Sequence, residues 1–433
     1  MNRTQFALSL APSLLARRWS ETELSQCLLQ RLPGPQKALS ERLAAELLQI
    51  FPGPVAPPER QLVVRLRDRP TFERLYRHCA KKAIWPAPVL TETRMQPASG
   101  VGRPEVPHLD TPGDFAAWLP VPVDRLNYLA DVDGRYACHA YRTIRHYHAV
   151  AEPKKSGGLR LIEAPKSQLK AVQRQILQGI LRHIPVHEAA YGFAPDKGCA
   201  DAARLHCGHD EVVCFDLADF FPSVSFSRVF GVFRHLGYPE AVTRLLAGLC
   251  TTETAPDVRG QFPFAMRQLY RIPHLPQGAP TSPALADILL FNLDCRLNAL
   301  SAKLGASYTR YADDLTFSGQ AGLGRGLLKL VPEIIRDEGF RSNPGKARVM
   351  PSGGRQVVTG IVVNAHLNMR RAEFDQLKAE IHACGRPGDL RLSDPHYRAR
   401  LIGRIQWLRH LNPARGEKLL TLLGWAEAQK ITA

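Results

Sequence analysis

The chain has 433 residues, with 57 Lys and Arg against 40 Asp and Glu, which gives a formal net charge of +17. Hydrophobic residues make up 45% and charged residues 22%, a globular composition that excludes a disordered chain, a collagen-like repeat and a small disulfide scaffold. The length leaves room for two or three domains. The positive excess favours a polyanionic partner, most often nucleic acid, over the alternative of a basic protein without one.

The first 110 residues predict a mostly helical extension. Residues 6–16 read as a first helix, and residues 43–51 carry apolar side chains at helical spacing. The proline-rich stretch 52–58 divides the region, because proline ends helices. A loose stretch over 85–114 predicts the boundary of the extension, whose role the residues leave open.

The cysteines and the lengths of the apolar runs indicate the cellular compartment of the protein. Nine cysteines occur without a CxxC pair, which indicates free thiols in a reducing, cytoplasmic setting. No run reaches the roughly 18 apolar residues of a membrane-spanning helix, so we expect no membrane partner.

From residue 115 onward, alternating helical and strand patterns predict an α+β fold. The last 60 or so residues return to a helical pattern, in which Leu401, Ile405 and Leu408 form an apolar stripe. Asn412 followed by Pro413 predicts a helix start, because asparagine caps helices and proline suits their first turn.

Two acidic segments carry the main chemical signal. Residues 308–318 predict a hairpin whose tight turn presents Asp313 and Asp314, and residues 212–221 predict a strand that ends at Asp216 beside the Leu217 carbonyl. Carboxylates gathered at strand ends hold two Mg²⁺ ions, with Mn²⁺ as a substitute, and such ions stabilise an in-line phosphoryl transfer. The alternative is a solvated turn and a surface acid.

A proline-rich loop lies between the acidic segments, at residues 275–283, and begins an apolar helix expected over 284–297. With this loop, the sequence resembles the reverse transcriptase family, and within it the bacterial retron-type enzymes, over about residues 115–425. The matching motifs follow in order, at 156–165, 169–177 with 190–193, the Asp216 strand, the loop, 311–314, 343–346 and 357–364.

The resemblance implies roles for the acidic residues. Asp216, Asp313 and Asp314 match the metal-binding catalytic triad, with Asp216 and Asp313 as the bridges between two ions. Leu217 adds its backbone carbonyl to this metal site.

The resemblance also implies a nucleotide site. Phe221 matches the aromatic gate beneath the sugar, which predicts deoxynucleotides, although a core aromatic is the alternative. Gln277 matches the residue that positions the incoming nucleotide.

Cations complete the implied nucleotide site. Lys155 and Arg160 match the residues that bind the triphosphate, and Lys154 is an equal candidate for the position of Lys155. Lys346 is expected near the leaving pyrophosphate, with a surface lysine as the alternative.

Two finer motifs point to retrons. Residues 358–360 match the Val-Thr-Gly element, and Ala203 with His206 match an Asn-Ala-x-x-His element whose asparagine is replaced by Ala202. This replacement leaves open whether His206 serves RNA recognition or is a packed histidine.

Basic residues predict the nucleic-acid surface. An amphipathic bundle with solvated cations is the alternative for each of them. The candidates for contact with RNA or DNA are Lys170, Arg174, Arg404, Arg415 and Lys418.

The resemblance implies a right-hand polymerase. We expect the extension over 1–110, fingers and palm over 111–345, and the end of the palm with a helical thumb over 346–433, with no room for an HNH-like endonuclease. The implied activity is RNA-directed DNA synthesis on a cognate structured noncoding RNA, in antiphage defence with a separate effector protein. The alternatives are another domesticated bacterial reverse transcriptase, a silent RNA-binding protein, or an RNA-dependent RNA polymerase, which Phe221 disfavours.

Overall fold

The structure is a computed structural model that describes residues 2–15, 17, 19–32, 37–52, 57, 59–86, 94–96, 104–154 and 157–431. The chain divides into two compact units, Met1–Pro185 with Asp219–Leu289, and Val186–Ala218 with Leu290–Ala433. The expected three-part division stays a prediction. The mixture of helices and antiparallel strands confirms the α+β class.

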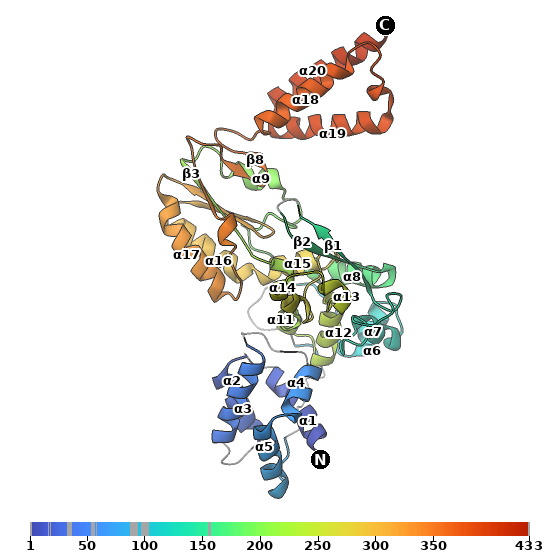
Figure 1. The fold of residues 1–433 in the computed structure, drawn as a ribbon, viewed down its shortest axis with the longest axis vertical. Helices are drawn as coiled ribbons and strands as arrows, with labels where there is room; N and C mark the ends of the chain where they lie inside the picture. Colours follow the sequence, from blue (N-terminus) through green and yellow to red (C-terminus); the bar gives the residue numbers. More distant parts are fainter. Residues whose placement is uncertain are drawn as a thin grey trace. The chain divides into compact units, whose positions relative to one another are not determined.

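The first unit begins with the N-terminal helices, drawn in blue in Figure 1: α1 (Arg3–Leu15), α2 (Glu21–Arg31), α3 (Lys37–Ile50), α4 (Glu59–Arg67) and α5 (Pro70–Lys81). They confirm the helices predicted at 6–16 and 43–51. Their core is apolar and includes Leu10, Leu28, Leu47 and Phe72. The proline-rich break lies mostly outside the described residues.

The rest of the first unit contains a two-stranded hairpin of β1 (Tyr147–Pro153) and β2 (Leu159–Pro165). Strands β1 and β2 pair antiparallel, with Tyr147 opposite Pro165. The elements are α6 (Pro112–Trp118), α7 (Val123–Ala130), β1 (Tyr147–Pro153), β2 (Leu159–Pro165), α8 (Ser167–Gly179), η1 (Leu181–His183), α10 (Phe220–Ser223), α11 (Phe226–His235), α12 (Glu240–Cys250), α13 (Pro256–Arg259), α14 (Phe264–Tyr270) and α15 (Ser282–Leu289).

The second unit contains the central sheet, a four-stranded antiparallel sheet in the order β4-β5-β3-β6. Helix α16 contacts β4, and α17 contacts β3. The elements are α9 (Cys199–Arg204), β3 (Glu211–Asp216), α16 (Phe291–Lys303), β4 (Ser307–Tyr311), β5 (Asp314–Gly319), α17 (Leu323–Asp337), η2 (Pro344–Lys346), β6 (Arg348–Pro351), β7 (Val357–Val358) and β8 (Ile361–Val362). Every residue of β3 is buried, because strands pair with both of its edges, α17 packs against it, and Val212 and Cys214 belong to an apolar cluster with residues of α9, β7 and β8.

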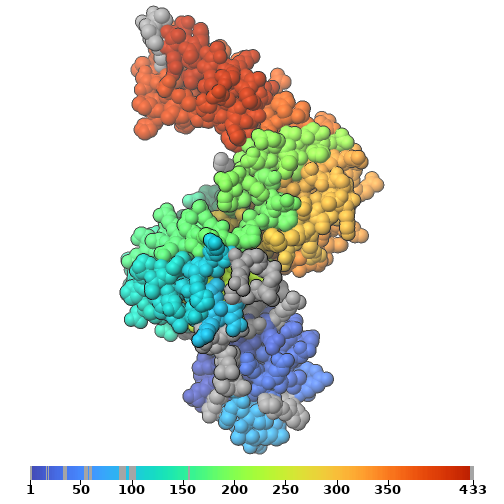
Figure 2. All heavy atoms as spheres, turned by 180° about the vertical axis from the view of Figure 1, so that it is seen from behind, coloured from blue at the N-terminus to red at the C-terminus, as the bar shows by residue number. Residues whose placement is uncertain are grey.

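Three helices end the second unit and form a core of their own, drawn in red in Figure 2. They are α18 (Arg371–Cys384), α19 (Pro395–Leu411) and α20 (Pro413–Ile431), with η3 (Arg391–Ser393) before α19. Leu401, Ile405 and Leu408 are buried, which confirms the predicted apolar stripe. The Asn412 Oδ1 accepts a hydrogen bond from the Arg415 amide at 3.2 Å, which confirms the predicted helix start.

The prediction of one apolar helix over 284–297 was wrong in one respect. The segment forms two helices, α15 and α16, which separate at Leu290, where ψ is 1°. Neither glycine nor proline marks this break, so the apolar pattern runs through it. Within the described residues, the structure has no helix of the length and apolar character that a membrane crossing requires.

Candidate active site

The central sheet brings the three predicted carboxylates to one end. Asp216 is the last residue of β3, and it lies opposite Asp314, the first residue of β5. Strands β4 and β5 form the predicted hairpin, and Ala312 and Asp313 are its two turn residues, between Tyr311 and Asp314. Directly opposed residues of an antiparallel pair have their Cβ atoms about 5 Å apart. The predicted hairpin and the predicted strand end are therefore confirmed, and we call residues 311–314 the acidic turn.

The carboxylates influence one another electrostatically. Desolvation at the sheet end, together with the negative charges of Asp313 and Asp216, raises the pKa of Asp314 to about 6. Because Asp314 is an exposed residue, we give the larger weight to the charge repulsion. Such a cluster is stabilised by a cation.

A lysine supplies a positive charge at this cluster. The Lys346 ammonium donates a hydrogen bond to Asp216 Oδ1 at 2.6 Å, although the lysine side chain is 56% exposed. Burial alone would lower the pKa of Lys346, but the Asp216 carboxylate raises it above its usual value. Sequence reasoning expected Lys346 near pyrophosphate and missed this ion pair.

The donor set fits a hard divalent cation. Carboxylate and carbonyl oxygens are the ligands that Mg²⁺ prefers. Within the described residues, no three His, Cys, Asp or Glu side chains already stand in metal-ligand geometry. The amide of Leu217 donates to the Asp313 carbonyl at 3.0 Å, so the backbone beside Asp216 is tied to the acidic turn.

The acidic turn has tight backbone neighbours. Ala312 has a φ of +55°, which non-glycine residues rarely adopt. A Cβ atom added to Gly192 would lie 2.2 Å from the Ala312 nitrogen, so only glycine fits at this position. The Arg310 amide donates to the Ala189 carbonyl, and its carbonyl accepts from the Tyr191 amide, both at 2.8 Å.

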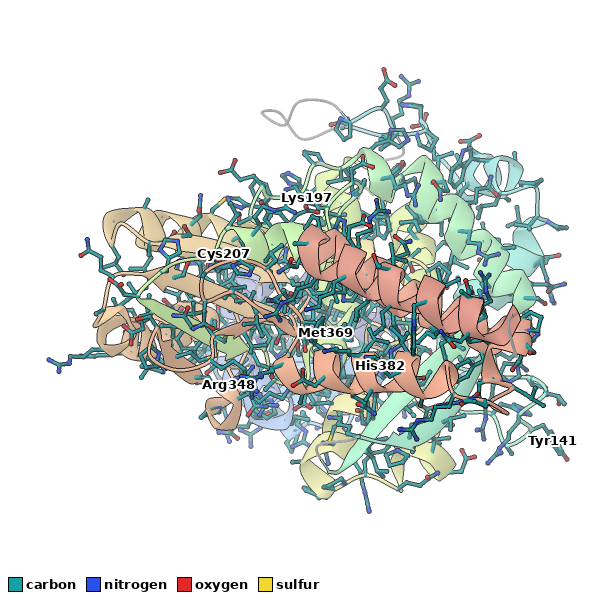
Figure 3. The ribbon with its side chains drawn as sticks, turned by 90° about the horizontal axis from the view of Figure 1, so that it is seen from above. Tyr141, Lys197, Cys207, Arg348, Met369 and His382 are labelled. Atoms are coloured by element: carbon teal, nitrogen blue, oxygen red, sulfur yellow. The ribbon has the colours of Figure 1, made fainter. Side chains whose placement is uncertain are left out.

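A lysine contacts the segment Ala189–Tyr191, which hydrogen-bonds to Arg310. Lys197, labelled in Figure 3, directs its ammonium to the carbonyl of Ala190 at 3.4 Å and lies 4.8 Å from the Tyr191 ring centroid. The motif at 190–193 therefore supports the hairpin from behind.

A buried ion pair supports the hairpin from helix α16. We call Arg310, Asp294 and Tyr308 the Arg310 network. The Arg310 guanidinium donates to Asp294 through Nε at 2.9 Å and Nη2 at 2.7 Å, and both side chains have 0% exposure. Tyr308 donates to Asp294 Oδ1 at 2.8 Å. Sequence reasoning missed this network, although an aspartate inside an apolar helix was a signal.

A histidine holds the same hairpin. His206 is fully buried, and its ring nitrogens lie 2.7 Å from Ser318 Oγ on β5 and 2.7 Å from Thr309 Oγ1 on β4. Burial, with a smaller contribution from His209, lowers the pKa of His206 to about 3, so its ring is neutral. In this geometry His206 is a packed histidine.

The predicted nucleotide residues other than Lys346 belong to the first unit. Arg160 is exposed on β2, and Phe221 is half-buried in α10 with its ring centroid 5.3 Å from that of Phe220. Lys155 lies outside the described residues, whereas the neighbouring Lys154 is half-buried.

The loop of Gln277 is tied to β2. The Gln277 carbonyl accepts a hydrogen bond from the Glu163 amide at 2.9 Å. A Cβ atom added to Gly278 would lie 3.0 Å from the Glu163 carbonyl oxygen, and its φ is +133°, so the close approach requires glycine.

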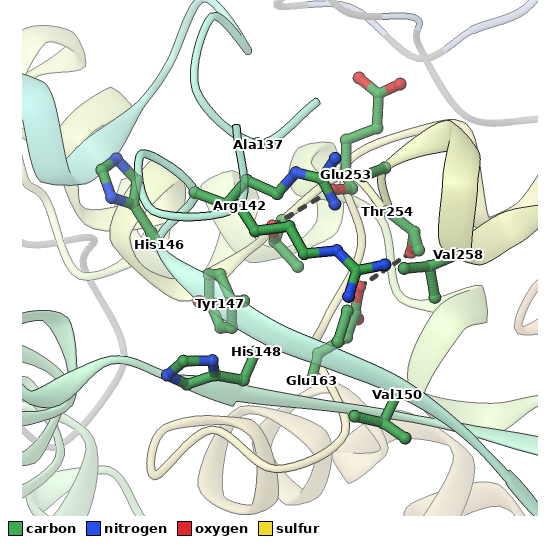
Figure 4. Close-up of a pocket in the computed structure, with 14 residues that line it drawn as sticks. Ala137, Arg142, His146, Tyr147, His148, Val150, Glu163, Glu253, Thr254 and Val258 are labelled. Carbon is green, nitrogen blue, oxygen red and sulfur yellow. Dashed lines mark hydrogen bonds between the residues drawn. The ribbon is translucent and has the colours of Figure 1, made fainter. Parts of the chain in front are cut away.

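A second buried ion pair lies beneath this loop. Glu163 accepts from Thr254 Oγ1 at 2.8 Å and contacts His274 Nε2 at 3.0 Å. Burial alone would lower the pKa of His274, but the Glu163 carboxylate raises it above the usual value. Glu163 and Thr254 also line a cavity of about 160 Å³, in which Figure 4 places Tyr147, His146 and Arg142.

The predicted nucleic-acid residues differ in how available they are. Lys170 and Arg174 are exposed on α8, and Lys418 is exposed on α20. Arg404 donates to Glu380 at 2.5 Å, and the Arg415 guanidinium lies 5.0 Å from the Phe374 ring centroid. These five residues stay predictions.

Sequence reasoning also passed over an exposed tryptophan. Trp407 on α19 is 40% exposed, and its ring stacks with His410 at 5.8 Å. Exposed aromatic side chains on which bases can stack are typical of surfaces that bind nucleic acid.

Comparisons with known proteins identify the family of the chain. The family described as "Reverse transcriptase (RNA-dependent DNA polymerase)" matches residues 152–368. The retron Mx65 reverse transcriptase of Myxococcus xanthus is 40% identical over 326 residues, which cover 74% of this chain and 72% of that protein. The retron Mx162 reverse transcriptase of the same organism is 38% identical over 338 residues, which cover 73% and 67%.

Solved structures give weaker likenesses. A foamy viral protease–reverse transcriptase in complex with double-stranded DNA has a TM-score of 0.35 at 13% identity, over 89% of this chain and 52% of that one. A telomerase from Candida albicans has a TM-score of 0.37 at 10% identity, over 97% and 83%. The assignment therefore depends on the sequence relatives. Together, the family match and these relatives establish that the chain belongs to the reverse transcriptase family, as a bacterial retron-type RNA-directed DNA polymerase.

Proposed function

We propose that this chain copies a cognate structured noncoding RNA into a short DNA by a two-metal phosphoryl transfer. The observation that carries the proposal is the pairing of Asp216 with Asp314, the last residue of the acidic turn, which brings Asp313 to the same end of the sheet. Three neighbouring carboxylates, one with a pKa raised to about 6, favour occupation by cations.

Asp216 and Asp313 would hold two Mg²⁺ ions, with Asp314 and the Leu217 carbonyl beside them, and Mn²⁺ would substitute. When bound, such ions stabilise the attacking and leaving oxygens of an in-line displacement. Lys346 keeps its proton next to Asp216 and, in this proposal, is a cation for the leaving pyrophosphate.

The nucleotide is proposed to contact residues of the first unit. Phe221 would exclude a 2′-hydroxyl with its bare phenyl ring, and Gln277 would position the base and sugar. Arg160, together with Lys155 or Lys154, would bind the triphosphate, because guanidinium and ammonium groups suit phosphate oxygens.

RNA template, primer and DNA product are the proposed partners. Lys170, Arg174, Arg404, Arg415 and Lys418 would contact phosphates, which position a duplex without reading its sequence. Trp407 adds an exposed ring to the surface of α19. Its exposure supports a contact to a sugar or base.

The test begins with the nucleic acid that co-purifies with the full chain after expression from its native locus. The same purification is done on the double variant Asp313→Ala with Asp314→Ala. Asp375→Ala is the matched control, because Asp375 is an exposed acid on α18, 3.7 Å from Arg371. Primer extension on an RNA template is measured for all three proteins with Mg²⁺, with Mn²⁺ and with a chelator.

We expect one RNA joined to a discrete DNA in the wild type and in Asp375→Ala, and no DNA in the double variant. Extension should stop with the chelator. Bound RNA without DNA in every sample, and no extension, would contradict the polymerase and favour a silent RNA-binding protein. DNA synthesis without a discrete RNA would favour another domesticated reverse transcriptase.

The defence role is proposed on family resemblance alone. It predicts that phage plate less efficiently on cells with the intact locus than on cells with the double variant. Equal plating across a panel of phages would contradict this role while leaving the polymerase intact.

A further inference from the structure

We infer that Arg310 is a positioning residue for Asp313, because its guanidinium holds the peptide that precedes this carboxylate. The inference rests on the proposed role of Asp313 as a metal ligand. It goes beyond that role by giving a function to a fully buried side chain outside the acidic turn.

Both peptides that flank Asp313 are held. The carbonyl of Ala312 accepts a hydrogen bond from Arg310 Nη1 at 3.3 Å. The carbonyl of Asp313 accepts one from the Leu217 amide at 3.0 Å. With both peptide planes fixed, the direction in which the Asp313 side chain leaves the backbone is fixed too. The second restraint is main chain, so Arg310 is the restraint that substitution can remove.

The arginine is itself held rigidly. Asp294 accepts from both Nε and Nη2, which is the fork geometry that guanidinium makes with a carboxylate. Tyr308 donates to the same carboxylate and fixes its orientation. Nη1 donates to the acidic turn, at the Ala312 carbonyl. Lysine offers a single ammonium, so it cannot hold Asp294 and Ala312 in the same way.

Stability alone does not account for this network. The desolvation of a buried ion pair offsets most of its Coulomb attraction, and apolar replacements of such pairs are often neutral or stabilising. What an apolar pair lacks is a donor for the Ala312 carbonyl. The positive φ of Ala312 makes this turn one that needs a specific restraint.

The experiment compares five variants of the full chain with the wild type, the fifth being Asp313→Ala. Arg310→Met with Asp294→Leu removes the ion pair but fills the space, and Arg310→Lys keeps the charge. Tyr308→Phe leaves the contact between Arg310 and Ala312 in place. Arg296→Met is the matched control, because Arg296 lies on α16, is exposed, and pairs with Asp337 and Glu338. The readouts are melting temperature, kcat and KM for primer extension, and Mn²⁺ affinity by calorimetry.

We expect the apolar pair and Arg310→Lys to lower kcat about 100-fold, with little change in the KM for deoxynucleotide. Mn²⁺ affinity should fall roughly tenfold in both, as when a group that orients a metal ligand is removed. The apolar pair should still fold, with a melting temperature lowered only as far as the Tyr308 hydroxyl and the Ala312 carbonyl, which lose these partners, account for. Tyr308→Phe and Arg296→Met should keep Mn²⁺ affinity and kcat within a fewfold.

Wild-type Mn²⁺ affinity and kcat in the apolar pair would overturn the inference. If that variant fails to fold, the Mn²⁺ affinity and kcat of Arg310→Lys are compared with those of Tyr308→Phe. Equal values in these two variants would overturn the inference. Asp313→Ala separates this inference from the proposed function. Mn²⁺ affinity lost in Asp313→Ala but kept in both Arg310 variants overturns the inference alone, whereas affinity kept in Asp313→Ala overturns the proposed role of Asp313 and this inference with it.

Discussion

The N-terminal helices and the central sheet are stabilised by different means. The core of α1–α5 is a cluster of apolar side chains, and its ion pairs, such as Arg3–Glu73, lie at the surface. The central sheet contains the buried Arg310–Asp294 pair and the buried His206.

This difference shows which region depends on directional interactions, that is, on hydrogen bonds of fixed angle and distance. Apolar burial depends on area and volume, and it leaves orientation to packing. Hydrogen bonds in a buried network depend on angle and distance, so they fix a few atoms closely. In the central sheet these directional interactions support the acidic turn, whereas the N-terminal helices have an apolar core.

The largest effect should come from removing one half of the buried pair. Asp294→Leu leaves the Arg310 guanidinium buried without a counter-charge, which should cost about 3–5 kcal/mol. The free energy of opening is measured by hydrogen exchange of peptides from β4 and β5, because the chain has more than one unit. Adding Arg310→Met to Asp294→Leu removes the unpaired charge and should restore most of the lost free energy of opening. A double variant that is less stable than Asp294→Leu would contradict this account of the buried pair.

A cavity in the core of the N-terminal helices should reduce their free energy of opening by almost as much. No substitution of a charged residue should restore this loss, because the core is apolar. Leu10 has 0% exposure, and Leu10→Ala should lower the free energy of opening of α1 and α2 by about 2–5 kcal/mol. Leu10→Met, which conserves volume, should cost less than about 1.5 kcal/mol. Exchange in β4 and β5 should not change, since α1–α5 have a core cluster of their own.

A loss of the same order is expected at the histidine of the sheet. His206→Ala leaves the hydroxyls of Thr309 and Ser318 without this partner, at about 1–3 kcal/mol for each hydroxyl that stays unsatisfied. Hydrogen exchange of β4 and β5 measures the loss. Leu205→Ala, at the exposed neighbouring position, is the control and should have little effect.

The last comparison separates two buried histidines by the pH dependence of unfolding. The pKa of His206 is lowered to about 3, so its stabilisation is present above about 6.5 and is lost as the pH falls toward 3. The pKa of His274 is raised, so its stabilisation is fully present below about 6.5 and is lost as the pH rises through the raised value. His206→Ala and His274→Gln should therefore change the pH dependence of unfolding in opposite directions. Changes of the same sign would contradict both assignments.

The sequence predicts local geometry well in this chain. The strand before Asp216 and the hairpin around Asp313 follow from β-forming residues on both sides of a turn signal, and both are confirmed. The predicted helix start at Asn412 is confirmed in the same way, since Asn412 accepts a hydrogen bond from the amide three residues later. These features depend on residues close in sequence.

The supporting contacts could not be predicted in the same way. His206 meets Ser318 across 112 positions, and Asp216 meets Lys346 across 130, so no local pattern pairs them. The break at Leu290 also escaped prediction, because an apolar run continues through it. Such pairings depend on the tertiary fold, which a periodic pattern in one segment does not specify.

The position of β3 in the sheet has a consequence for synthesis of the chain. Both neighbours of β3 lie far downstream, since β5 begins at Asp314 and β6 ends at Pro351. A ribosome that adds about 5–20 residues per second needs about 5–20 s for the roughly 100 residues between β3 and β5. During that time the nascent chain carries an apolar strand with two unpaired edges, which is the kind of segment that chaperones shield from aggregation.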